Sequence, residues 1–167
     1  MQTITKTFNI YNYDELPEDT KELLLEKQKE ICEEIYCECC LLEDMEEKAT
    51  DLLLKYFGEK AKFNRVFYDL GYCQGDGAMI EFNLTYYNKE LKIKHSGYYY
   101  HELCFTIEEL NDCLTDKQYK QLKEKIYKMN VELKKFGYAQ IEQDFSEWAL
   151  DELTEKTFYI NGDIFEG

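Results

Sequence analysis

The chain has 167 residues, with 35 acidic and 20 basic side chains and a formal net charge of −15 at pH 7. This length suits one hydrophobic core, so we expect residues 1–167 to form a single domain. The acidic excess argues against direct nucleic-acid binding and against a polybasic membrane anchor. The longest apolar runs are too short to cross a membrane, which predicts a cytoplasmic protein with no membrane partner.

The N-terminal part predicts one strand and a long acidic helix. Residues 3–11 are rich in β-branched and aromatic side chains, as in a strand. Pro17 suits the first turn of a helix, and apolar residues then recur at a helical period over residues 24–56. Gly58 is a good helix-ending residue. These signals predict one long helix, or two helices with a bend between them.

The central part predicts an antiparallel meander. Aromatic, strand-like runs cover residues 63–72 and 78–87, and the turn sequence 74–77 separates them. A second turn candidate follows at residues 88–89. The remaining strand segments are 91–95 and 97–105, broken at residues 96–97.

The C-terminal part predicts helices and a hairpin. Thr115 and Gln118 form a capping-box pattern for a helix that Gly137 ends. A further helix covers residues 141–153, and a hairpin covers residues 157–165. The expected fold class is α+β: an antiparallel β-meander packed against about three helices, including a long acidic N-terminal helix.

The densest local motif is the Cys73–Gly77 hairpin tip. Turn chemistry alone explains its glycines and Asp76, which favours a simple hairpin. The alternative is a small-ligand or enzyme site, for which the candidate residues are Cys73, Gln74, Asp76 and His101. A third glycine and a following helix are missing, so the motif is no nucleotide fingerprint. Since no known catalytic pattern occurs, we expect no enzyme activity, no cofactor and no metal.

The seven cysteines predict free thiols. Their number is odd, and the expected compartment is reducing, which argues against a disulfide framework. Cys37, Cys39 and Cys40 do not have the spacing of a zinc knuckle. The full set is Cys32, Cys37, Cys39, Cys40, Cys73, Cys104 and Cys113.

Acidic and tyrosine side chains are the candidates for protein contacts. The acids of the long helix form either a solvated face or a negative strip that imitates nucleic-acid phosphates. Fifteen tyrosines offer apolar anchors, or an interface for a homo-oligomer. The acids selected for partner binding are Glu33, Glu34, Glu38, Glu43, Asp44, Glu46 and Glu47.

Four segments together resemble a group of small phage and prophage proteins. They are the opening Phe8–Leu16, the central Phe67–Ala78, the strand-like Gly97–Glu102, and the end near Asn161–Asp163. The chain departs from that group at Pro17, where a Ser or Thr cap is usual, and at Gly71, where Ser is commoner. The resemblance implies a phage or mobile-element origin more than a mechanism.

The resemblance and the acidity together favour a non-enzymatic inhibitor. Small acidic phage proteins often inhibit host systems that target nucleic acids, such as CRISPR effectors and restriction enzymes. The expected partner is therefore a host protein with a basic nucleic-acid-binding surface, met in the host cytosol.

Overall fold

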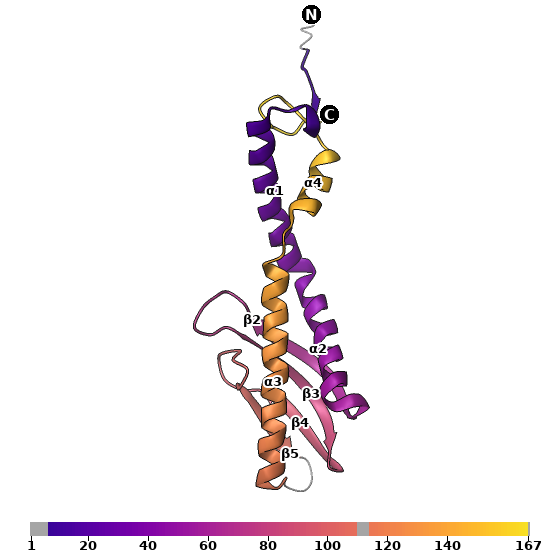
Figure 1. Cartoon of the computed structure of the whole chain (residues 1–167), viewed down its shortest axis with the longest axis vertical. Helices are drawn as coiled ribbons and strands as arrows, with labels where there is room; N and C mark the ends of the chain where they lie inside the picture. Colours follow the sequence, from indigo (N-terminus) through magenta and orange to yellow (C-terminus); the bar gives the residue numbers. More distant parts are fainter. Residues whose placement is uncertain (1–6, 110–113, 167) are drawn as a thin grey trace, which may run out of the picture. The chain divides into compact units, whose positions relative to one another are not determined.

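The structure, a computed structural model, describes residues 7–109 and 114–166 and has the expected α+β class (Figure 1). The structure divides the chain into two compact units. Unit 1 comprises residues 1–38 and 143–167, and unit 2 comprises residues 39–142.

Unit 2 contains the expected antiparallel meander. The strands lie in the order β2-β3-β4-β5, and each pairs with the next along the chain. Tyr87 and Asn88, which join β3 to β4, both have positive φ values (50° and 61°), as a two-residue hairpin turn requires. The strands are β2 (Ala61–Asp69), β3 (Gly77–Tyr86), β4 (Lys89–His95) and β5 (Phe105–Glu109).

Two helices pack on this sheet: α2 (Leu41–Phe57) contacts β2, α3 (Asp116–Ile141) contacts β3, and the helices contact each other (Figure 1). The capping box at the start of α3 is confirmed, because the Gln118 backbone N–H donates to Thr115 Oγ1 at 3.3 Å. Gly58, with φ of 64°, ends α2 as expected, and the short 3-10 helix η2 (Gly58–Lys60) follows. The fully buried core side chains include Ile80, Phe82, Leu84, Ile93, Ile126 and Leu133.

Alternation along β3 separates the two faces of the sheet. Ile80, Phe82 and Leu84 are fully buried, whereas the residues between them are half-buried. The half-buried residues form polar contacts, such as the Asn83 Nδ2 to Asn64 Oδ1 hydrogen bond of 3.2 Å. The sheet therefore presents an apolar face to the core, and its other face is polar at residues 81 and 83 but includes the fully buried Met79.

Three boundaries differ from the sequence-based predictions, and an alternative that the sequence left open is resolved. Residues 97–104 form a loop, and β5 begins only at Phe105, because Glu102 O accepts a hydrogen bond from Asn130 and Tyr100 N–H donates to Gly75 O. Gly137 lies inside α3, where a side chain would collide with Leu70 and Met45. Of the two alternatives for the long helix, the structure has two helices, which break at Cys40. Of the expected first strand only Tyr11 is paired, and residues 3–6 lie outside the described range.

Unit 1 is built from the N-terminal and C-terminal segments of the chain. Strand β1 pairs with β6 in antiparallel register, and the expected C-terminal hairpin is present, with Tyr159 N–H donating to Asp163 O at 2.8 Å. Tyr13, Leu16, Leu153 and Phe158 form its core. No helix in the described parts of the chain is long and apolar enough to cross a membrane. The elements are β1 (Tyr11–Asn12), η1 (Tyr13–Glu15), α1 (Glu18–Cys39), α4 (Ser146–Thr154) and β6 (Thr157–Phe158).

The contact between α2 and α3 gives a first prediction. Glu132 Oε2 accepts a hydrogen bond from Lys55 at 2.6 Å, and Oε1 accepts one from the Tyr56 hydroxyl at 2.5 Å. The bond to the carboxylate, with burial, raises the pKa of Tyr56 to about 12. In the Glu132→Gln variant the pKa of Tyr56 should fall toward 10.0, the ordinary value, as followed by NMR of the tyrosine ring carbons. Glu124→Gln is the control, because Glu124 pairs with Lys128 instead; an equal change there would contradict the assignment.

Candidate functional site

The predicted hairpin tip is a folded loop, residues 70–76, between β2 and β3. Asp76 is only 4% exposed although it is charged and lies in a surface loop. Its Oδ2 accepts a hydrogen bond from the Tyr138 hydroxyl of α3 at 2.5 Å, and its backbone N–H donates to Cys73 O at 3.2 Å. The loop is therefore tied to α3 through a buried carboxylate, a contact that turn chemistry alone does not require.

Three side chains of this segment converge. Asp69 ends β2, while Cys73 and Asp76 lie in the loop, and one ligand-type atom from each lies within 4.8 Å of the others. Asp69 is half-buried and accepts a hydrogen bond from Gly71 N–H at 3.2 Å. Cys73 is exposed. The geometry is that of a small local cluster that opens to solvent at the thiol.

The charges in the cluster influence one another. Hydrogen bonds from the Cys73 thiol and the Tyr138 hydroxyl lower the pKa of Asp76. The same contact with Asp76 raises the pKa of Cys73, and burial together with Asp76 raises the pKa of Tyr138. A raised pKa leaves the thiol protonated at neutral pH, which is the opposite of an activated nucleophile.

The other two predicted ligand residues do not join this cluster. Gln74 and His101 are both exposed, and neither forms a hydrogen bond or ion pair with Asp76 within the described residues. The backbone of His101 does lie against Gly77, but its imidazole contacts the Tyr99 ring, with centroids 5.9 Å apart. Two residues that the sequence analysis did not select, Asp69 and Tyr138, complete the cluster instead.

A second set of contacts holds the loop of residues 96–104. Lys134 Nζ lies 3.1 Å from Glu102 Oε1 and donates to Asp76 O at 3.3 Å. Asn130 is fully buried and donates from Nδ2 to Glu102 O at 3.1 Å. Helix α3 thus anchors both loops at one end of the sheet.

The seven predicted partner-binding acids belong to different units. Glu33, Glu34 and Glu38 are exposed on α1 of unit 1. The other four lie on α2 of unit 2; Glu43 and Glu47 are exposed, while Asp44 and Glu46 are half-buried. They are therefore two groups of carboxylates, one on each unit.

Helix α1 carries a longer series of acids than the sequence analysis selected. A glutamate recurs at every fourth residue and is exposed each time. Within the described residues Glu18 forms an ion pair, with Lys21 at 3.6 Å, and the other five form none. The fixed spacing in the sequence was the signal for this series. We call it the glutamate row: Glu18, Glu22, Glu26, Glu30, Glu34 and Glu38.

Net charge is divided unequally between the units. Unit 1 has 17 acidic and 5 basic residues, a net charge of −12. Unit 2 has 18 acidic and 15 basic residues, a net charge of −3. Helix α3 alone has seven lysines and three acids. The acidity of the chain is therefore largely a property of unit 1.

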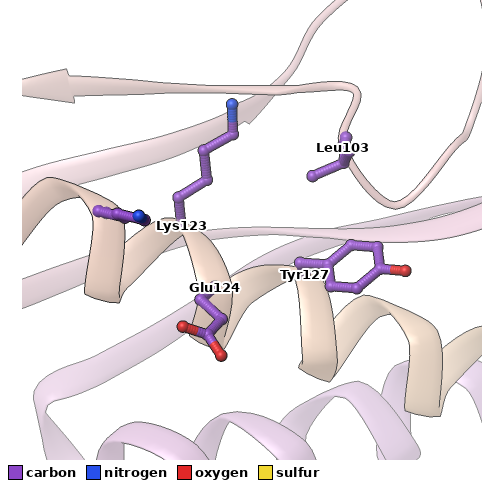
Figure 2. A pocket seen from close by; sticks show the side chains of 5 residues that line it. Leu103, Lys123, Glu124 and Tyr127 are labelled. Atoms are coloured by element: carbon purple, nitrogen blue, oxygen red, sulfur yellow. The ribbon is translucent and has the colours of Figure 1, made fainter.

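Unit 2 has a pocket of about 350 Å³ between α3 and the loop of residues 96–104. Figure 2 shows Leu103 of the loop facing Lys123 and Tyr127 of α3. The exposed tyrosines that were candidates for protein contacts also belong to this unit: Tyr72, Tyr87, Tyr98, Tyr99, Tyr119 and Tyr127. None of the predicted ligand residues lines this pocket.

Unit 1 has an apolar groove of about 430 Å³ between α1 and the C-terminal hairpin. Leu24, Ile31 and Ile164 contribute apolar surface, and Ile31 is 46% exposed. Lys27, Asp163 and Glu166 lie at the same groove. Unit 1 therefore combines acidic side chains with accessible apolar surface.

The cysteines within the described residues are free, and Cys113 lies outside them. Cys37 and Cys39 are exposed on α1, and Cys32 is buried. In comparisons with known proteins, the chain matches no family model, no curated protein and no solved structure. The function is therefore argued from the charge, burial and geometry of this chain.

Proposed function

We propose that the chain is a binding protein whose unit 1 docks on a basic surface of a partner protein. The observation that carries the proposal is the net charge of −12 on unit 1, together with the exposed glutamate row of α1. The partner class is a protein that binds nucleic acid, and the effect is inhibition by occupation of its phosphate-binding groove.

The carboxylates of the glutamate row produce one continuous negative electrostatic field along α1 rather than separate local charges. Successive members are about 6 Å apart along the helix axis, from a rise of about 1.5 Å per residue. That distance is shorter than the Debye length of about 10 Å at 0.1 M salt, so neighbouring carboxylates act together. Like charges four residues apart also destabilise a helix by roughly 0.2–0.5 kcal/mol per pair. A cationic partner relieves this repulsion, which favours the bound state.

The groove of unit 1 supplies the second component of a protein contact. Charge steers association and sets its salt dependence, whereas buried apolar area supplies much of the affinity. Ile31 and Ile164 are exposed beside the acids of α1 and the hairpin. The fitting partner therefore offers lysine or arginine side chains around an apolar group.

The class of target rests on chemistry and on the resemblance to phage proteins. Proteins that handle nucleic acids have basic grooves because they neutralise phosphates with lysine and arginine. A phage protein that competes for such a groove protects its own nucleic acid from host defence. Restriction enzymes and nucleic-acid-guided nucleases are the effectors of this kind that a host cytosol offers.

Matched charge variants test the proposal. Glu33→Gln, Glu34→Gln and Glu38→Gln remove three charges from unit 1, and Glu43→Gln, Glu46→Gln and Glu47→Gln remove three from unit 2. Binding to a panel of purified nucleases is measured at 0.1 M and at about 0.5 M salt, where screening is stronger. The unit 1 variant should bind about tenfold more weakly at low salt, since three screened contacts of roughly 0.5 kcal/mol are lost. The unit 2 variant should bind within about threefold of the parent.

Two other results would contradict the proposal. Equal losses in the two triple variants would show that total charge matters rather than the surface of unit 1. Binding that neither variant nor salt changes would show that the carboxylates do not carry the contact. Circular dichroism of both variants confirms that the helices remain folded.

A further inference from the structure

We propose that Asp69, Cys73 and Asp76 bind a divalent cation of the zinc class. One ligand-type atom from each lies within 4.8 Å of the others. The three residues lie in unit 2 and share no member with the glutamate row, so this site is independent of the proposed partner surface.

The buried carboxylate of Asp76 is the second observation. Asp76 is 4% exposed, and Oδ2 already accepts the hydrogen bond from Tyr138. Oδ1 is buried, and the donor beside it is the Cys73 thiol, a weak hydrogen-bond donor. A buried carboxylate oxygen without a strong donor is costly, because the water that solvated it has been removed. A cation between Asp76 and its two neighbours would satisfy that oxygen.

The backbone holds the cluster in place. Asp69 and Gly77 are paired residues of β2 and β3, so the strand ladder fixes the two ends of the loop. Within the loop Asp76 N–H donates to Cys73 O at 3.2 Å, and Tyr100 N–H donates to Gly75 O at 3.2 Å. The ligands therefore come from a closed segment whose ends cannot separate, which lowers the entropic cost of binding a metal.

The donor set identifies the class of metal. One thiolate and two carboxylates suit zinc and cobalt, whereas magnesium and calcium prefer oxygen donors alone. Zinc bonds are about 2.3 Å to sulfur and about 2.0–2.2 Å to carboxylate oxygen, so binding draws the three ligands together. Cys73 is exposed, which leaves an entry path and a fourth coordination position for water. The thiol loses its proton on binding.

Cobalt titration of the reduced, full-length chain tests the site. Binding of one equivalent should produce the near-ultraviolet absorption of a thiolate–cobalt bond, and zinc should abolish it. Cys73→Ser should remove that absorption, while the control Cys37→Ser with Cys39→Ser, on α1, should retain it. Asp69→Asn should weaken zinc binding at least tenfold in competition with a metal indicator. Asp69 is half-buried and makes only a local backbone hydrogen bond, so this variant should stay folded even if Asp76→Asn does not.

Any one of three results would overturn the assignment. The first is absorption that persists in Cys73→Ser, and the second is absorption that disappears in the variant with both Cys37→Ser and Cys39→Ser. The third is an Asp69→Asn variant that binds zinc as tightly as the parent. Because the readout is metal binding itself, none of these results depends on whether a protein partner exists.

Discussion

Replacement of Gly77 by alanine should destabilise unit 2 by about 3 kcal/mol, near the top of the range for overpacking. A Cβ at this position would lie 2.0 Å from the carbonyl oxygen of Tyr100 and 2.9 Å from the Cα of His101. These are backbone atoms, so no change of side-chain rotamer relieves the collision. The loop of residues 96–104 must move away from β3, and the hydrogen bond from Tyr100 N–H to Gly75 O is lost with it.

Urea unfolding followed by far-ultraviolet circular dichroism measures this effect. Trp148, the single tryptophan, lies in unit 1, so its fluorescence follows that unit separately. Gly71→Ala is the matched control, because its Cβ would meet only Asp69 Oδ1 at 3.4 Å, an ordinary contact. That variant should stay within about 0.5 kcal/mol of the parent. If the two alanine variants unfold at the same urea concentration, the close approach at Gly77 is not rigid.

Local sequence signals predicted the elements whose causes are themselves local. The capping box at Thr115 depends on residues three apart, and the end of α2 at Gly58 depends on one positive φ value. The turn between β3 and β4 and the C-terminal hairpin are also short-range features. Each of these places agrees with the sequence-based prediction because the residues that decide the geometry are neighbours in the chain.

Long-range packing decided the places where the prediction was wrong. Glycine at position 137 predicts a helix end. Instead it lies inside α3, where Leu70 and Met45 pack so closely that there is no room for a side chain. The aromatic run of residues 97–105 predicts a strand. In the structure Asn130 donates to Glu102 O and Tyr100 N–H donates to Gly75 O, so these backbone groups do not pair with a neighbouring strand. Neither contact has a signature in the local sequence.

The candidate metal cluster also combines residues that local sequence signals identify with residues that only the folded chain brings together. Cys73 precedes the turn sequence of residues 74–77 and Asp76 lies within it, and both were selected for that reason. Asp69 joins them only through the register of β2 with β3, and Tyr138 reaches Asp76 from 62 residues further along the chain. The glutamate row is different, since its spacing was visible in the sequence and only its exposure on α1 required the structure.

Replacement of Asn130 by leucine should cost unit 2 about 3 kcal/mol, although the two side chains have similar volumes. Strand β4 pairs with β3 only as far as Phe82, so the backbone N–H of Ile80 has no strand partner on that side. Asn130, which is fully buried, supplies the missing acceptor at 3.3 Å and also donates to Glu102 O at 3.1 Å. Leucine leaves a buried donor and acceptor unpaired, at roughly 1–3 kcal/mol each.

Hydrogen exchange at Ile80 tests this role directly. Its amide should exchange about a hundredfold faster in Asn130→Leu, because each 1.4 kcal/mol corresponds to about tenfold in the opening equilibrium. Asn83→Leu is the matched control: it removes an exposed amide pair with Asn64 from the polar face of the same strand. That variant should change stability by less than about 0.5 kcal/mol. An Ile80 amide that exchanges equally slowly in both variants would show that β3 does not depend on α3 for this hydrogen bond.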